Sequence, residues 1–325
     1  MASETIKLAS GMEMPLVGFG LWKVLKESAA DTVYNAIKVG YRLFDGAYDY
    51  QNEAEAGQGI KRAIDEGLVK REDIFVTTKL WCNYKRKEHA TKMTRAQIDA
   101  WGLGYIDLFL IHFPVALKYI DPKVVPYPGF TSDEKGNIEL DRVPIRETWE
   151  VLESLVDDGL VKSIGVSNFQ AQSLYDLQSY CKHPVSALQI EHHPYLVQPT
   201  LISMAQENGI AVTAYSSFGP QSFLELPGQF SERAKGIAPL FETMTIQKIA
   251  NKHGVTPAQV LLRWATQRGV AVIPKSNSPD RLKQNLEVNH FDLTSDEINE
   301  ITNMDRGLRF NDPGYTLSKP LRIFA

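Results

Sequence analysis

Short apolar runs recur along the chain, and each follows a helical pattern that ends in glycine. Four of these repeats stand at 38–44, 158–164, 208–212 and 268–273. Glycine supplies the left-handed cap just past a helix end, and a short apolar run is typical of a strand buried on both faces. The pattern therefore predicts helices that each return the chain to a parallel sheet.

Reading every such unit predicts eight strands with helices between them. The strands are expected at 16–20, 41–45, 74–80, 105–113, 161–167, 187–191, 211–216 and 270–275. Helix starts are indicated at Thr200 after Pro199, and at Thr256 and Ser278, each of which precedes a proline. Eight alternating units without a linker predict an α/β fold, a single (β/α)8 TIM barrel in one domain over 1–325.

Other segments lie outside this alternation. The stretch 5–15 predicts an N-terminal β-hairpin that closes the bottom of the barrel. Two long segments rich in proline and glycine, 114–144 and 217–239, each follow a predicted strand. We therefore expect both on the C-terminal face, where barrel active sites are built. The C-terminal tail after Met304 lacks periodicity and is expected to fold over the same face.

Composition narrows the class of protein. With 43% apolar and 23% charged residues, it excludes disordered, collagen-like and disulfide-scaffold proteins. The net charge of −4 offers no basic footprint, so we expect neither a nucleic acid nor a membrane as partner. The two cysteines, Cys82 and Cys181, indicate free thiols in a reducing compartment. Because 1–10 lacks the pattern of a secretory signal and 108–117 is too short to span a bilayer, a cytoplasmic location is expected.

Four titratable residues stand at or just after the ends of three consecutive predicted strands. Asp45 ends the second strand, with Tyr50 five residues on; Lys79 stands at the end of the third, and His112 at the end of the fourth. The spacing is about one βα unit each time. Because the carboxyl ends of barrel strands meet at one rim, we expect these side chains to converge.

Together the four residues suit carbonyl reduction or alcohol oxidation. The Lys79 ammonium stands in an apolar run and needs a carboxylate, for which Asp45 is the candidate. A nearby cation is expected to lower the pKa of Tyr50, so that the phenol exchanges a proton with a carbonyl oxygen that His112 orients. Taken singly, a strand-end Asp can be a helix cap, and a Tyr or His can belong to the core.

A second candidate site binds an anion. The chain contains no Gly-x-Gly-x-x-Gly between strand and helix and no Walker loop. Instead the eighth predicted strand ends in Lys275, and Arg281 stands in the first turn of the following helix. Helix N-terminal amides with two cations fit the 2′-phosphate of NADPH, although a basic solvated turn is the alternative. The run 191–193, Glu-His-His, lacks metal-ligand spacing, so no metal is expected.

Three long motifs carry a resemblance to a known family. They are 40–47 with Glu53 and Gly57, 162–169, and 273–276 with Arg281, Gln284 and Asn285. With these motifs in order, the whole chain resembles the aldo-keto reductases, and within them the fungal D-xylose reductases.

The resemblance implies a role for each matching position. Tyr50 would be the general acid, tuned by Lys79 and Asp45, with His112 orienting the carbonyl. Ser167, Asn168 and Gln189 would bind the nicotinamide carboxamide, and Tyr215 would stack on its ring. The residues implied to hold the adenosine 2′-phosphate are Lys275, Ser276, Asn277 and Arg281, with Gln284 and Asn285 at the adenine. Lys23 and the loop 216–225, including Ser216, Ser217 and Glu225, would strap the pyrophosphate and ribose.

The resemblance also implies a sugar substrate. Asp49 and Asn311 would contact sugar hydroxyls, and an apolar wall would comprise Trp22, Trp81, Phe113 and Phe223. The expected reaction is the NADPH-preferring reduction of an aldose, D-xylose to xylitol. Asn277 and Glu225 resemble residues of relatives that also accept NADH. A reductase for glycerol-type, galactose-type or aliphatic aldehydes is the nearest alternative, and a non-catalytic cofactor-binding barrel is an alternative from another class. Both a monomer and a homodimer stay open.

Overall fold

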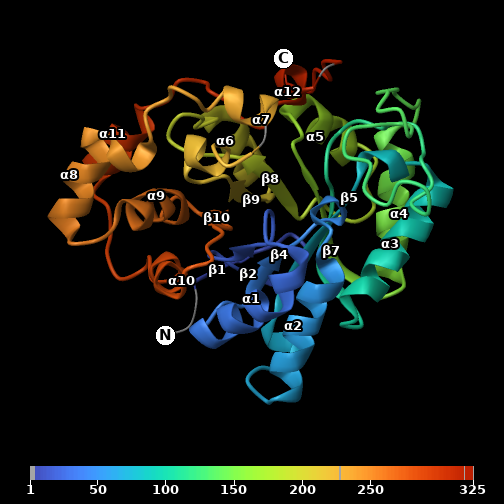
Figure 1. Cartoon of the computed structure of the whole chain (residues 1–325), viewed down its shortest axis with the longest axis horizontal. Helices are drawn as coiled ribbons and strands as arrows, with labels where there is room; N and C mark the ends of the chain where they lie inside the picture. Colours follow the sequence, from blue (N-terminus) through green and yellow to red (C-terminus); the bar gives the residue numbers. More distant parts are fainter. Residues whose placement is uncertain (1–3, 227, 318, 325) are drawn as a thin grey trace.

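Eight parallel strands form one sheet, which closes on itself at the centre of the molecule (Figure 1). The computed structural model describes residues 4–226, 228–317 and 319–324. In chain order the strands are β3 (Phe19–Gly20), β4 (Leu43–Asp45), β5 (Phe75–Leu80), β6 (Ile106–Ile111), β7 (Val161–Ser167), β8 (Ala187–Glu191), β9 (Ala211–Tyr215) and β10 (Val270–Val272). Each pairs with the next, and a parallel bridge between Val17 and Val272 joins the first to the last. The predicted barrel is confirmed.

Helices surround the strands in Figure 1. The longer helices are α1 (Lys26–Val39), α2 (Glu53–Asp65), α3 (Lys87–Trp101), α4 (Ile145–Asp157), α5 (Ala171–Gln178), α6 (Pro199–Glu207), α8 (Met244–His253), α9 (Pro257–Thr266), α10 (Pro279–Leu286) and α11 (Ser295–Thr302). Short helical turns are η1 (Tyr48–Tyr50), η2 (Arg71–Asp73), η3 (Cys82–Tyr84), η4 (Gly219–Ser222), α7 (Gln229–Glu232), η5 (Leu240–Glu242) and α12 (Pro313–Thr316). Within the described residues, no helix is both long and apolar enough to cross a bilayer.

The predicted strands at 161–167 and 187–191 match the structure, but others are shorter than predicted: β3 begins at Phe19 rather than at 16, β4 begins at Leu43 rather than at 41, and β6 ends at Ile111 rather than at 113. Thr256 and Ser278 cap α9 and α10 as expected, since each side-chain oxygen accepts a backbone N–H from the first turn. Thr200 is not a cap: α6 begins at Pro199, because proline with its fixed φ suits the first helical position. The last strand ends at Val272 rather than at 275, where Pro274 cannot donate to a ladder.

Strand alternation decides which side chains enter the barrel. Apolar side chains from the lower strand positions, such as Leu43, Phe75 and Leu108, form one buried cluster with Leu8 and Met14 from the N-terminal segment. The hairpin of β1 (Thr5–Lys7) and β2 (Glu13–Pro15) thus closes the bottom of the barrel as predicted. With a period of two, the same inward faces continue upward to polar residues at the other end of the barrel.

Three long segments cover that upper end. The segment 114–144 contains no helix or long strand, only a bridge between Leu117 and Leu140. The segment 217–239 contains η4 and α7, and the tail after Met304 contains α12. Arg233 of the second segment pairs with Asp312 of the tail at 3.4 Å. The long segments and the tail therefore lie on the C-terminal face, as the sequence predicts.

Candidate active site

One large cleft opens at the C-terminal face of the barrel, with a volume of about 1170 Å³. Strand ends, both long segments and the tail contribute to its walls. Every residue that we predicted for catalysis, cofactor or substrate lines this cleft, except Lys79 and Ser167, which lie behind it. The structure therefore brings together residues that are up to 289 positions apart in the sequence, from Trp22 to Asn311.

A buried ion pair lies at the floor of the cleft, where Asp45 lines the cleft and Lys79 lies behind it. The Lys79 ammonium donates to Asp45 Oδ1 at 2.6 Å and to the carbonyl oxygen of Gly46 at 2.8 Å. It also reaches the phenol oxygen of Tyr50 at 3.3 Å. The other carboxylate oxygen of Asp45 accepts the side-chain amide of Gln189 at 2.7 Å. Three strands and the turn η1 thus hold the Tyr50 hydroxyl in place.

The prediction that Lys79 lowers the pKa of Tyr50 is wrong. Burial, followed by the negative charges of Asp45 and Asp49, holds the pKa of Tyr50 well above its ordinary value. The positive charge of Lys79 does not reverse this shift, because Asp45 lies against that ammonium at 2.6 Å, and burial lowers the pKa of Lys79 as well. The phenol therefore stays protonated at neutral pH, which is the state that a proton donor needs.

His112 follows β6 directly and lies beside Tyr50, with their rings 6.0 Å apart, edge to face. Burial, followed by the positive charges of Lys79 and Lys85, holds the pKa of His112 well below its ordinary value. The imidazole is therefore neutral at physiological pH. The buried Nδ1 of His112 makes no hydrogen bond to any described residue. The ring is held instead by packing against Trp81, with the ring centroids 4.9 Å apart.

A hydrogen-bonded series of polar side chains crosses the cleft next to His112. Asn168 donates to the carbonyl oxygen of His112 at 2.9 Å and accepts the hydroxyl of Tyr215 at 2.6 Å. Asn311 of the tail donates to the same Tyr215 oxygen at 3.0 Å. The Ser167 hydroxyl donates to the carbonyl of Gln189, so it supports the neighbouring strand rather than lining the cleft.

The far end of the cleft is positively charged. Lys275, Ser276, Asn277, Arg281, Gln284 and Asn285 line it, at and after the N-terminus of α10. The Arg281 guanidinium donates to the Ser276 hydroxyl at 3.4 Å, so both face one point. Burial, opposed by Glu225 and reinforced by repulsion from Lys275, lowers the pKa of Lys23. The Lys23 and Lys275 ammonium groups are therefore close enough to repel each other.

The segment 217–239 reaches across the cleft to the loop after β3. Lys23 donates to the carbonyl oxygen of Ser222 at 2.7 Å and lies 3.8 Å from a Glu225 carboxylate oxygen. The Trp22 and Phe223 rings lie 5.8 Å apart, and Phe223 continues to Phe310 of the tail at 5.6 Å. These contacts cover the middle of the cleft.

Aromatic rings form the other side of the cleft. Trp81 donates its indole N–H to the carbonyl oxygen of Gly129 at 2.6 Å and packs against Phe130 at 4.8 Å. Phe113 also meets Phe130, at 5.1 Å. Phe130 and Phe310 line the cleft but were not predicted, because they belong to non-periodic segments whose path the sequence pattern does not reveal.

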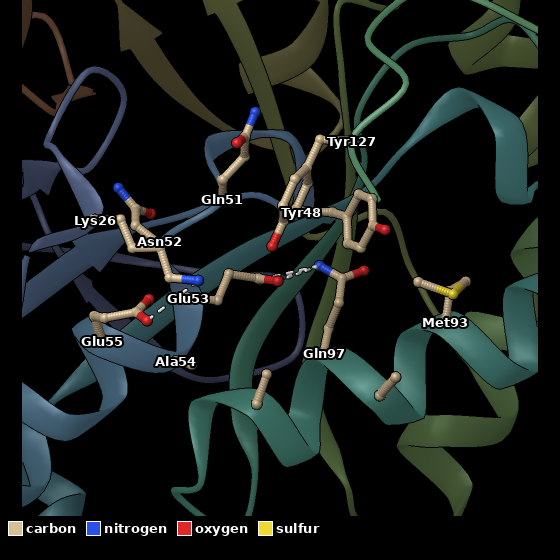
Figure 2. A pocket seen from close by; sticks show the side chains of 12 residues that line it. Lys26, Tyr48, Gln51, Asn52, Glu53, Ala54, Glu55, Met93, Gln97 and Tyr127 are labelled. Carbon is tan, nitrogen blue, oxygen red and sulfur yellow. Dashed lines mark hydrogen bonds and ion pairs between the residues drawn. The ribbon is translucent and has the colours of Figure 1, made fainter. Parts of the chain in front are cut away.

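A smaller pocket of about 120 Å³ lies outside the barrel wall, between η1, α2 and α3 (Figure 2). Glu53 enters it from α2 and accepts the side-chain amide of Gln97 at 3.0 Å and the indole of Trp101 at 2.9 Å. Thr78 donates to the same carboxylate, and Gln97 also donates to the carbonyl oxygen of Lys79. Glu53 therefore supports β5 from outside at the residue next to Lys79, a function that its motif alone did not indicate.

The side chains of the run 191–193 contact other residues of the fold. Glu191 accepts the His193 Nε2 at 2.9 Å, and both side chains are fully buried. His192 instead stacks on Trp264, with ring centroids 4.7 Å apart. Among the described residues, no group of three His, Cys, Asp or Glu side chains is arranged to hold a metal ion.

Comparisons with known proteins agree with this geometry. The pattern of the Aldo/keto reductase family matches residues 16–306. The NAD(P)H-dependent D-xylose reductase of Aspergillus niger is 57% identical over 322 residues, which cover 99% of this chain and all of that protein. The NAD(P)H-dependent pentose reductase of Pyricularia oryzae is 56% identical over 331 residues, which cover both chains fully.

Solved structures give the same result. The aldose reductase of Schistosoma japonicum superposes with a TM-score of 0.83 at 36% identity, covering 94% of this chain and 93% of that one. An aldo-keto reductase of Bombyx mori, solved in complex with NADP, superposes with a TM-score of 0.84 at 34% identity, covering 96% of each chain. The likeness thus extends over more than nine-tenths of the chain.

Proposed function

The chain belongs to the aldo/keto reductase family, and we propose that it reduces the aldehyde group of an open-chain aldose with a nicotinamide cofactor. One observation carries this proposal. The Tyr50 hydroxyl lies 3.3 Å from the Lys79 ammonium and beside the His112 ring, and Tyr50 and His112 both line a cleft of about 1170 Å³. This arrangement suits proton donation to a carbonyl oxygen.

The residues of the cleft fit a nicotinamide dinucleotide. Lys23, Lys275 and Arg281 place positive charge along its length, as a pyrophosphate and a 2′-phosphate require. Ser217 Oγ and Gln221 Nε2 are buried, line the cleft and have no partner among the described residues. Unpaired buried polar atoms are costly unless a ligand or water satisfies them.

A different group of residues would hold each part of the cofactor. Asn168 and Gln189 would hold the carboxamide, supported from behind by the Ser167 hydroxyl, which contacts both residues. Tyr215 would lie against the nicotinamide ring. Lys275, Ser276, Asn277 and Arg281 would hold the 2′-phosphate, Gln284 and Asn285 the adenine, and Lys23 with Ser216, Ser217 and Glu225 the central part. A bound 2′-phosphate gains the charge-assisted contacts that the 2′-hydroxyl of NADH lacks, so we propose that NADPH is preferred and NADH accepted.

Proton transfer is the chemical task of the chain's own residues. When bound, a reduced nicotinamide would supply the hydride that the carbonyl carbon gains. Tyr50 donates its hydroxyl proton to the carbonyl oxygen, which becomes the new hydroxyl of the product. The Lys79 ammonium then faces the Tyr50 phenolate, and Asp45 keeps that ammonium charged within the barrel. His112, being neutral, orients the carbonyl oxygen through a ring N–H without competing for the proton.

The substrate is proposed to be a pentose, with D-xylose reduced to xylitol. The named relatives from Aspergillus niger and Pyricularia oryzae are D-xylose and pentose reductases. In this chain, Asp49 and Asn311 both line the cleft and offer polar groups to sugar hydroxyls. Trp22, Trp81, Phe113 and Phe223 supply the apolar wall.

A substrate and cofactor matrix tests the proposal. The purified chain is incubated with NADPH or NADH and with D-xylose, L-arabinose, D-galactose, glyceraldehyde or butanal, and oxidation of the cofactor is followed. We expect the highest kcat/KM with NADPH and D-xylose. A higher kcat/KM for galactose or butanal would replace the pentose assignment, and no cofactor oxidation with any aldehyde would refute the enzymatic function.

The thiols fit a reducing environment. Cys82 and Cys181 are both free, and burial raises the pKa of each. Thiols of this kind resist oxidation because the reactive thiolate is scarce. We propose that the protein works in the cytoplasm, which an intact-cell fractionation with the activity assay would test.

A further inference from the structure

The carboxylate of Glu191 is fully buried at the end of β8 and holds a piece of the chain 119 residues away. Oε1 accepts the backbone N–H of Phe310 at 2.8 Å, and Oε2 accepts the backbone N–H of Asn311 at 2.8 Å. The His193 ring supplies a third donor, to Oε1, at 2.9 Å. Two consecutive amides of the tail therefore converge on one carboxylate, an arrangement that favours an ionised acceptor.

The tail segment that Glu191 holds is the one that faces the cleft. Phe310 and Asn311 both line the cleft, whereas Glu191 does not. The Asn311 side chain donates to Tyr215, which donates to Asn168, which donates to the carbonyl oxygen of His112. A continuous series of hydrogen bonds thus runs from Glu191 through the tail to the residue beside Tyr50.

Other anchors of the tail lie on either side of this point. Arg309 donates to the Gln198 side chain at 2.7 Å, and Asp312 pairs with Arg233 at 3.4 Å. Neither contact fixes the backbone of Phe310 or Asn311. Burial acts to raise the pKa of Glu191, but the hydrogen bond and charge of His193, with Arg309 nearby, hold that pKa below its ordinary value. The Glu191 carboxylate is therefore ionised, and both of its oxygens accept hydrogen bonds from the two backbone N–H groups and the His193 ring.

We propose that Glu191 is a positioning residue that sets substrate specificity: by fixing the backbone at Phe310 and Asn311, it aims the Asn311 amide at the sugar-binding part of the cleft. The proposal rests on the function proposed above. In this role Glu191 holds the tail in one position, where the tail contacts a polyhydroxy aldehyde. An apolar aldehyde needs no such amide, so its reduction depends less on Glu191.

Glu191→Gln tests this proposal. The carboxamide keeps the shape but has one acceptor oxygen, and its NH₂ group would face a backbone N–H. We expect kcat/KM for D-xylose to fall roughly tenfold or more beyond any fall for butanal, as the loss of one charge-assisted hydrogen bond implies. The fall should lie mainly in KM. In an Asn311→Ala background, the same substitution should change the ratio of the two kcat/KM values less than twofold.

Glu153→Gln is the matched control. Glu153 is also a buried glutamate that accepts two consecutive backbone amides, those of Lys182 and His183, but it lies on α4 and away from the cleft. We expect Glu153→Gln to leave the xylose-to-butanal ratio unchanged. An equal fall for both substrates in Glu191→Gln, or a normal ratio, would overturn the proposal.

Hydrogen–deuterium exchange supplies a readout that needs no turnover. In Glu191→Gln, peptides covering Phe310 and Asn311 should exchange faster, while peptides of β5 and β6 stay as in the wild type. Unchanged exchange in the tail would contradict the anchoring role even if no aldehyde were reduced, so the two proposals fail separately. If Glu191→Gln does not fold, Glu191→Asp, which keeps the charge but shortens the reach, is measured in the same way, with the same outcomes.

Discussion

The Lys79 ammonium and the Asp45 carboxylate lie 2.6 Å apart inside the barrel, and neither side chain is more than 2% exposed. Two opposite charges buried this deeply depend on each other, because each would be left without compensation by the loss of its partner. The pair also stands between the apolar lower barrel and the cleft. It therefore links the stability of the fold to the chemistry at Tyr50.

Lys79→Met should both destabilise the protein and abolish turnover. The uncompensated Asp45 carboxylate is expected to lower the free energy of unfolding by about 3–5 kcal/mol, measured by denaturant titration. The double variant Asp45→Asn with Lys79→Met should regain most of this stability without regaining activity. A single variant as stable as the wild type would show that the pair is not a mutually dependent unit.

The pH dependence of sugar reduction should report Asp49. Burial raises the pKa of Asp49 to about 6, so its carboxylate becomes protonated and a weaker acceptor as the pH falls through that value. We expect kcat/KM for D-xylose to fall below about pH 6, while kcat/KM for butanal stays level. Asp49→Asn should remove this acidic limb. An acidic limb that persisted in Asp49→Asn would show that a group other than Asp49 titrates.

The buried ammonium of Lys85 destabilises the folded state, and replacing Lys85 with an apolar residue should remove this penalty. Its ammonium is buried and has no hydrogen-bond partner among the described residues, and burial lowers its pKa to about 8. Below that pH both the folded and the unfolded chain are protonated, so the folded state bears the whole penalty, about 3 kcal/mol. We expect Lys85→Met to raise the free energy of unfolding at pH 7.

The same linkage gives a sign for the pH dependence. As the pH rises from about 8 towards the ordinary lysine value of 10.5, the folded chain loses the Lys85 proton before the unfolded chain does. The stability of the wild type relative to Lys85→Met should therefore rise over this window. If the difference in free energy of unfolding between the two proteins did not change with pH, the pKa of Lys85 would not be lowered in the folded chain. A Lys85→Met variant less stable than the wild type at pH 7 would contradict the expected penalty.

Much of the site could be predicted because parallel strands of a barrel end at one rim. Asp45, Lys79 and His112 needed only the strand assignment and a spacing of about one βα unit to be grouped, and the structure places them together. The motif residues of α10 were likewise local, since Ser278 caps the helix that carries Arg281. The roles of these residues stay predictions.

Other features depend on contacts between distant segments and could not be predicted in this way. Phe130 and Phe310 reach the cleft through segments without periodicity, and the path of the tail depends on Glu191, 119 residues before Phe310. The direction of the Tyr50 pKa shift could not be predicted for a related reason. It depends on how completely the segments bury the phenol and on the balance between Lys79 and Asp45, neither of which is a local property.

Cofactor preference should depend on Arg281. Arg281→Ala is expected to weaken NADPH binding roughly tenfold, the loss of about one charge-assisted contact, while the Kd for NADH stays nearly the same. Lys283→Ala is the matched control, because Lys283 lies on the same helix, faces Glu287 at 3.9 Å and does not line the cleft. Equal weakening of both cofactors in Arg281→Ala would contradict the 2′-phosphate assignment.

The role of Tyr50 is tested by Tyr50→Phe, with Tyr48→Phe as the control from the same turn. Tyr48 points to the outer pocket of Figure 2, where its hydroxyl donates to the carbonyl oxygen of Pro126 at 2.5 Å. The decisive measurement is single-turnover reduction of D-xylose by NADPH, with NADPH binding measured in parallel by fluorescence. We predict that Tyr50→Phe binds NADPH as the wild type does but loses at least about 10²-fold of the rate, while Tyr48→Phe keeps it. A Tyr50→Phe variant that binds NADPH and reduces D-xylose at the wild-type rate would contradict the central claim that Tyr50 is the proton donor.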